Sequence, residues 1–438
     1  MPFPLRFPRE MQWLLKAAHL LCTIQGDPER VNLVLELQQL LIRRIARSKL
    51  SHERLQDARL RLKQRLVRER LIGEKARETK ELVLKIQDRC DALEHLRFLY
   101  RCFGDGIAAA YHPPQRHRYF YFAQRSFVKE RSGLLSRQET FRRRYRALRL
   151  GTGMGIPVVL AEVTNMVVQG DICVLAGSEP QPVELKSFVQ RARPGRLVDE
   201  ELRRTMRLLA GAGPADFHRA RNANARPSEE HHAKAHASHL NDCVQQAMES
   251  GIAQVFPEEG LRYVAIRTDY YQSKPGCLQA LKGMASKSLM SIQVAPEMAW
   301  VPMQPFTLSM TAENAVLFMQ GAFQLFVCVD MKVLVSHFTS LGVHAIALMD
   351  GVTALQISND PEDPGPGAYR VSEVVFQRIS CEFIALRSFA QEMAAMLEPA
   401  EAPCLHDAGD RDLLFAPAAP DWEETRQHYY DEEGPRLH

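Results

Sequence analysis

The chain has 438 residues, of which 46% are hydrophobic and 25% charged, and a formal net charge of +4. This composition is ordinary for a globular protein and allows two or three domains. No apolar run reaches the roughly eighteen residues that a membrane-spanning helix needs, which argues against a membrane protein. The nine cysteines never form Cys-x-x-Cys, which argues against a thiolate zinc site. With no signal-peptide pattern in residues 1–21, we expect a cytoplasmic protein.

The charge is unevenly distributed along the chain. Residues 1–150 contain 33 basic and 16 acidic residues, a balance of +17, whereas the remainder has a balance of −13. A basic third beside an acidic remainder indicates a polyanionic partner, most simply nucleic acid. The alternative is a long helical domain whose arginines are only solvated.

Residues 8–110 are expected to be helical. Asp27 and Pro28 form a helix start, and Ser51 is placed to begin a further helix. Four helices with short joins predict a bundle over residues 1–112, extended like a coiled coil, which also offers a surface to a protein partner. The expected bundle is followed by a linker over residues 104–114. One helix is crowded with basic residues that are either solvated or in contact with phosphates: Arg61, Lys63, Arg65, Arg68 and Arg70.

A second basic region precedes the middle of the chain. Residues 116–125 combine four consecutive aromatics with basic flanks, which is typical of a buried strand or of a base-stacking surface. Residues 136–150 predict a helix, and residues 151–155 predict its end. Five arginines of that helix are expected to grip nucleic-acid phosphates: Arg142, Arg143, Arg144, Arg146 and Arg149.

The next segment carries the candidate chemistry. The apolar runs 172–176 and 183–185 flank turn-forming residues, which predicts a β-hairpin. Because side chains alternate along a strand, Glu184 and Lys186 share one face, and folding can bring Asp171 beside them. Two carboxylates are suitable ligands for Mg²⁺, or for Mn²⁺ in its place, and a lysine can orient or deprotonate a water. The alternative is an exposed ion pair at the edge of a sheet.

This pattern of Gly-Asp-Ile-Cys-Val, twelve residues, and Val-Glu-Leu-Lys resembles the signature of the PD-(D/E)XK, or restriction-endonuclease-like, nuclease superfamily. The resemblance covers roughly residues 139–271. It implies that Asp171, Glu184 and Lys186 are catalytic and that Asp171 and Glu184 bind the metal. The sequence departs from the family at Gly170, where the family name has Pro. Many members add an acid from the helix before the first strand, which implies Glu139 as a further metal ligand, with Glu162 as its competitor.

The remainder of the chain is expected to continue as α/β structure. Residues 198–210 predict a helix, residues 261–267 the next strand of the nuclease sheet, and residues 344–357 a hairpin around Asp350 and Gly351. Residues 371–397 carry an apolar stripe with helical spacing, which predicts one long helix. Four histidines are more typical of a solvated helix start than of a zinc site: His231, His232, His236 and His239.

Together these patterns predict an α+β multidomain protein. The helical bundle over 1–112 precedes a restriction-endonuclease-like α/β core with a mixed sheet over 113–275, which carries a mobile insertion at 211–240. An α/β region over 276–398 completes or flanks the core, and an acidic tail over 399–438 is expected to be disordered.

The leading hypothesis is a Mg²⁺-dependent deoxyribonuclease, endo- or exonuclease, and the resemblance implies a role in phage defence, restriction or repair in a bacterial cytosol. Two alternatives stay open. One is a catalytically silent nucleic-acid-binding or partner-scaffolding protein with a nuclease-like fold. The other is a helical scaffold whose nuclease part is switched on by another subunit.

Overall fold

The computed structural model describes residues 5–70, 72–112, 122–123, 126–127, 138–167, 170–177, 179–185, 203–204, 206–207, 235–278, 281, 288–296, 305–359 and 368–397. The chain divides into two compact units, each assembled from separate stretches of sequence. The helical unit contains residues 6–226 and 296–320, and the sheet unit contains residues 1–5, 227–295 and 321–438. Across the described ranges, no helix is both long enough and apolar enough to cross a membrane.

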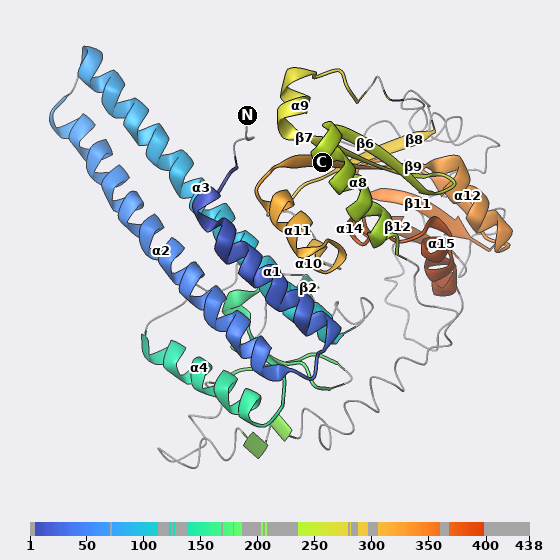
Figure 1. Cartoon of the computed structure of the whole chain (residues 1–438), viewed down its shortest axis with the longest axis horizontal. Coiled ribbons are helices and arrows are strands. Elements are labelled where there is room, and N and C mark those ends of the chain that lie inside the picture. Colours follow the sequence, from blue (N-terminus) through green and yellow to red (C-terminus); the bar gives the residue numbers. More distant parts are fainter. Residues whose placement is uncertain are drawn as a thin grey trace. The chain divides into compact units, whose positions relative to one another are not determined.

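The N-terminal part of the helical unit contains three α-helices rather than the expected four (Figure 1). They are α1 (Met11–Gly26), α2 (Val31–Arg68) and α3 (Gly73–Tyr111). A short 3-10 helix, η1 (Pro8–Glu10), precedes them. The predicted break at Ser51 was wrong, because α2 is continuous through this residue, where the Ser51 hydroxyl donates to the Arg47 carbonyl at 3.0 Å. A serine that bonds back by one turn is compatible with a helix interior.

The predicted linker over residues 104–114 was also wrong, because α3 continues through it to Tyr111. Gly104 allows this continuation to pack tightly. A Cβ atom at Gly104 would lie 1.9 Å from the Val163 carbonyl oxygen, closer than atoms can approach. The glycine therefore marks close packing of a helix against backbone, and not a flexible join.

A small antiparallel sheet packs beside these helices in the order β3–β4–β5. Its strands are β3 (Val158–Leu160), β4 (Ile172–Val174) and β5 (Gln181–Val183), and η3 (Ala161–Val163) follows β3 directly. The expected hairpin is confirmed, with Ile172 opposite Val183. The remaining elements of the unit are a short strand pair and three helices: β1 (Phe122–Ala123), β2 (Ser126–Phe127), α4 (Gln138–Gly153), α10 (Phe306–Ser309) and α11 (Ala312–Met319).

The described residues of the sheet unit form two antiparallel sheets. The larger has the order β6–β7–β9–β8, with β6 (Ile252–Glu258), β7 (Leu261–Arg267), β9 (Phe323–Asp330) and β8 (Leu289–Val294). The smaller has the order β10–β11–β12, with β10 (His344–Ala347), β11 (Thr353–Ser358) and β12 (Ala368–Ser372). Three longer helices accompany them: α8 (Ala237–Ser250), α12 (Met331–Ser340) and α15 (Leu386–Ala394). The shorter ones are α9 (Thr268–Ser273), α13 (Glu373–Phe376), α14 (Arg378–Cys381) and η5 (Ala395–Leu397).

Strand β7 corrects one expectation from the sequence. It was predicted to extend the sheet of the hairpin, but it pairs with β6 and β9 in the other unit. Every strand pair among the described residues is antiparallel, so the mixed sheet that the resemblance implies is not found there. The architecture is an N-terminal helical region followed by an α/β part with antiparallel sheets.

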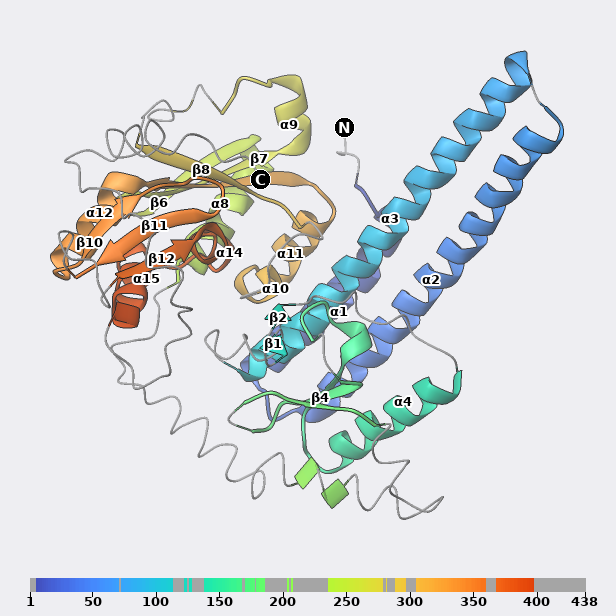
Figure 2. The same ribbon diagram turned by 180° about the vertical axis from the view of Figure 1, so that it is seen from behind.

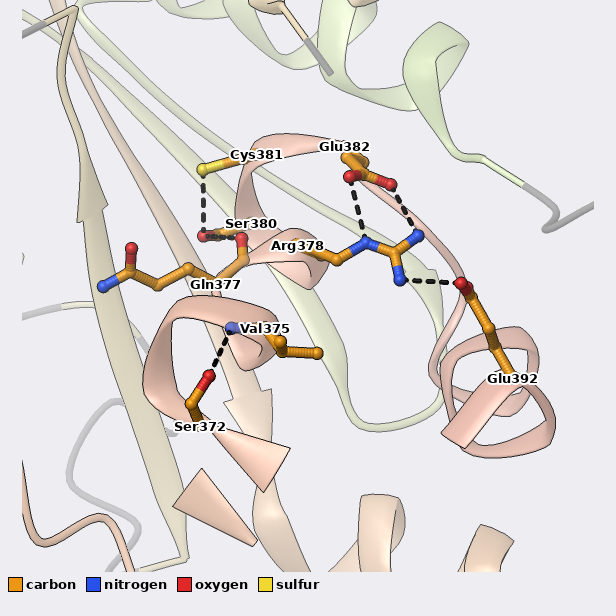
Figure 3. Close-up of polar contacts among 8 residues, drawn as sticks. All are labelled: Ser372, Val375, Gln377, Arg378, Ser380, Cys381, Glu382 and Glu392. Atoms are coloured by element: carbon orange, nitrogen blue, oxygen red, sulfur yellow. Dashed lines mark hydrogen bonds and ion pairs between the residues drawn. The ribbon is translucent and has the colours of Figure 1, made fainter. Parts of the chain in front are cut away.

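The predicted long helix over residues 371–397 is broken into several pieces (Figure 3). Phe383 adopts a positive φ of 55°, which redirects the chain between α14 and α15. Across this break the buried Arg378 guanidinium donates to both Glu382 oxygens at 3.0 Å and to Glu392 Oε1 at 2.8 Å. Burial opposes the charge of Arg378, but these two carboxylates raise its pKa. The apolar stripe is buried by short helices held together by this ion pair network.

Several expectations fall outside the described residues. They are the aromatic run up to residue 121, most of the insertion at 211–240, and the acidic tail. Of the histidines, His236 and His239 are described. His236 is buried just before α8, so for this residue the expected solvated helix start was wrong, and its Nε2 lies 3.6 Å from Glu258 Oε2.

Candidate functional site

The candidate site lies at the end of the small sheet in the helical unit, where β4 begins and β5 ends. Gly170 lies two residues before β4 and has a φ of +74°, and a Cβ atom there would lie 2.9 Å from the Val183 nitrogen. Proline has φ fixed near about −65°, so it could not adopt this conformation. This geometry explains why glycine stands where the nuclease signature has proline.

Asp171 is fixed in place by backbone and side-chain contacts. Its nitrogen donates to the Val183 carbonyl at 2.9 Å, and its Oδ2 accepts from the Leu185 nitrogen at 2.9 Å. The ladder of β4 and β5 ends at the Ile172–Val183 pair, and these two bonds of Asp171 are to the residues on either side of Glu184. The Glu184 side chain is exposed, and Lys186 lies outside the described residues.

Arg144 of α4 joins two carboxylates. Its Nη2 lies 2.5 Å from Asp171 Oδ1, and its Nη1 forms an ion pair with Glu162 Oε1. The three side chains are 14%, 12% and 3% exposed for Arg144, Asp171 and Glu162, respectively. Ion pairs that are largely shielded from water hold their side chains in place more firmly than exposed ion pairs do. Arg144 therefore fixes the two acids next to each other.

Glu162 is therefore the second acid that the structure brings to Asp171. It lies in η3, directly after the β3 strand that pairs with β4. Glu139, the acid preferred from the resemblance, lies in the first turn of α4, and its side chain is outside the described part of the molecule.

The five arginines of α4 divide into two groups. Arg144 is largely buried and directed to Glu162 and Asp171. The other four are exposed on the same helix: Arg142, Arg143, Arg146 and Arg149. Only these four are accessible to a macromolecular ligand, so the predicted phosphate grip depends on them.

Two residues of α3 that the sequence did not indicate complete the surroundings. The Arg101 Nε donates to the Glu162 carbonyl at 3.2 Å, and burial, reinforced by the charge of Arg97, lowers the pKa of Arg101 to about 10. The buried Asp105 accepts hydrogen bonds from the Asn165 nitrogen at 2.7 Å and from the Met166 nitrogen at 2.8 Å. These contacts hold the segment between η3 and β4, and with it the position of Glu162.

The donor chemistry of this cluster fits a divalent cation. Asp171 and Glu162 supply the hard carboxylate oxygens that Mg²⁺ prefers. They already bind one cation, the Arg144 guanidinium, so a metal ion would share or take over its place at Asp171. Within the part of the chain that the structure describes, no three Asp, Glu, His or Cys side chains are grouped as metal ligands. Among the signature acids with a described side chain, Glu184 is exposed and is the candidate for a third protein ligand.

No protein-family model, curated protein or solved structure matches this chain. The assignment of the site therefore depends on the residues of this chain and on the contacts between them.

Proposed function

We propose that the chain is a metal-dependent nuclease that hydrolyses DNA phosphodiester bonds at the β4–β5 end of the small sheet. One observation carries the proposal: hydrogen bonds to Val183 and from Leu185 hold Asp171 against the backbone on either side of Glu184. The resemblance to the PD-(D/E)XK nucleases supplies the roles of Glu184 and Lys186, of which Lys186 lies outside the described residues.

In this proposal Asp171, Glu162 and Glu184 hold Mg²⁺, or Mn²⁺ in its place. The bound metal would polarise the scissile phosphate and activate a water. Lys186 orients or deprotonates that water, or stabilises the negative charge that develops on the phosphate. Arg144 keeps Asp171 and Glu162 together before the metal and the substrate bind.

The direct test is to incubate the protein with linear, circular and single-stranded DNA in the presence of Mg²⁺, Mn²⁺ or EDTA. We expect cleavage with either metal, none in EDTA, and none by Asp171→Ala or Lys186→Ala. A variant at either position that cleaves at the wild-type rate would remove the site assignment.

A second function is favoured by the Arg144 bridge itself. Because a guanidinium already neutralises Asp171 and Glu162, the same fold could hold nucleic acid without cutting it. This silent binding protein would show salt-sensitive DNA binding and no cleavage with Mg²⁺ or Mn²⁺. If the protein is a silent binding protein, the Arg144→Gln variant should also show no cleavage. If it is a nuclease, Arg144→Gln should change the metal requirement of cleavage.

A further inference from the structure

The α2–α3 hairpin carries an unusual arrangement of arginines along one side of α2. Arg47, Arg54, Arg61 and Arg68 recur at every seventh residue, and all four are exposed. Arg43 and Arg65 lie one turn away from Arg47 and Arg61 and are exposed as well. At about 100° per residue, which follows from about 3.6 residues per turn, all six point within a narrow sector of the helix. We call these six residues the arginine stripe.

The stripe is not used to stabilise the fold. Among the described residues, only Arg65 of the six has an ion-pair partner, Glu69 at 2.9 Å. The face of α2 that packs in the core is separate and consists of apolar residues such as Leu37, Leu41 and Ile45, all buried. Six like charges along one helix face repel each other, so the arrangement indicates an external anion.

The stripe lies on a projecting part of the helical unit. Figures 1 and 2 show from both sides that α2 and α3 run side by side and extend beyond α1. Beyond about the middle of the hairpin most side chains are exposed, including Val67 at 77% and Ile72 at 86%. A straight hairpin with this exposure can lie along an extended ligand without rearranging the rest of the unit.

The exposed arginines of α4 adjoin the first residues of the stripe. Gln39 Nε2 of α2 donates to the Tyr145 hydroxyl of α4 at 2.9 Å. Arg43 is one turn beyond Gln39 on α2, and Arg142 and Arg149 lie one turn before and after Tyr145 on α4. The two sets of arginines therefore belong to one basic surface, which continues from the hairpin to the helix that supplies Arg144.

We propose that the arginine stripe binds the phosphate backbone of a DNA duplex and guides it along α2 toward α4. With a rise of about 1.5 Å per residue, the distance from Arg43 to Arg68 is about 38 Å, which matches about 11 base pairs at about 3.4 Å each. No aromatic side chain lies within the stripe, so it cannot stack bases and reads only the backbone.

A duplex fits this surface better than a single strand. A duplex is straight over this length because its persistence length is about 150 base pairs, and its high charge density releases many counterions. A single strand would lose conformational entropy when it is straightened along the helix. The inference takes its ligand from the proposed function, but it concerns binding and not cleavage.

The test compares two variants in EDTA, where cleavage is absent. The first replaces Arg47, Arg54, Arg61 and Arg68 with Gln. The control replaces four exposed basic residues of α3 with Gln, which removes the same charge from the same hairpin: Lys75, Arg77, Lys80 and Lys85. Binding of a fluorescent 24-base-pair duplex and of its single strand is measured by anisotropy over a range of salt concentrations. Circular dichroism checks that both variants unfold at the wild-type temperature.

We expect the stripe variant to bind the duplex at least tenfold more weakly than the control at 100 mM salt. The slope of log K against log salt should fall by about 3 to 4, because each lost phosphate contact removes about 0.9. Equal weakening in both variants, no duplex binding by the wild type, or tighter binding of the single strand would each overturn the inference. Duplex binding by the stripe without cleavage in Mg²⁺ would instead refute the proposed nuclease and leave the stripe intact.

Discussion

The ion pairs of Arg144 with Asp171 and Glu162 lead to a prediction about stability that does not depend on activity. Arg144→Met removes the guanidinium that joins Asp171 and Glu162 while keeping much of the side-chain volume. Asp171 keeps its hydrogen bond from the Leu185 nitrogen, but Glu162, only 3% exposed, loses its ion pair with Arg144. Removal of one partner from a buried ion pair costs about 3 to 5 kcal/mol, so we expect a loss of that size.

The assay is urea unfolding followed by circular dichroism, with two matched variants. Arg142→Met changes an exposed arginine on the same helix and should alter the free energy of unfolding by less than about 0.5 kcal/mol. Adding Glu162→Gln to Arg144→Met removes the buried charge that was left behind, so most of the stability should return. If Arg144→Met is as stable as Arg142→Met, the bridge does not hold the site and the reasoning fails.

Three further predictions concern the fold around the site and the two units. Gly104→Ala should destabilise the protein by about 1 to 3 kcal/mol, because the added methyl would meet the Val163 carbonyl; Gly153→Ala, with nothing within 4 Å, should be neutral in the same unfolding assay. Burial, and then the charge of Arg97, lowers the pKa of His52, although Glu94 opposes this. His52 therefore binds a proton less readily in the folded state than in the unfolded state. The contribution of His52 to stability is fully present above about pH 6.5 and declines as the pH falls below that value. His52→Gln should reduce this decline, measured as the difference in free energy of unfolding between urea titrations at pH 7.5 and 5.5. Arg378→Met should cost about 3 to 5 kcal/mol because it leaves Glu382 buried without its cation, and an unchanged melting temperature would contradict that.

The hairpin could be predicted from the sequence because the information is local. The alternation of apolar residues, the turn residues and the position of Gly170 all lie within residues 167–186. The structure confirms the β4–β5 pairing that these signals predict.

The remainder of the site depends on contacts between distant parts of the chain. Arg101 and Asp105 lie about 60 residues before the segment that they hold, and Asp105 falls within the stretch 104–114 that was predicted to be a linker. The choice between Glu139 and Glu162 required knowing which way Arg144 points, and helical spacing alone could not give that. An arginine embedded among apolar residues of an expected helix, as Arg101 is, was the one available signal.

The breaks in the C-terminal half had a similar origin. The apolar residues of 371–397 do recur with helical spacing, but Val371 is used in strand β12 and Phe383 in a turn with positive φ. The contacts of Arg378 with Glu382 and Glu392 set the path of the chain there. The spacing of the apolar residues carries no information about these contacts.

The most direct test of the central claim is the cleavage rate of Glu184→Gln. Glu184 is exposed, so this substitution should leave the melting temperature unchanged. A metal ligand contributes several kcal/mol to stabilisation of the transition state. We therefore predict that Glu184→Gln cleaves duplex DNA in Mn²⁺ at least about 100-fold more slowly than the wild type. A folded Glu184→Gln protein that cleaves DNA within twofold of the wild-type rate would contradict the account.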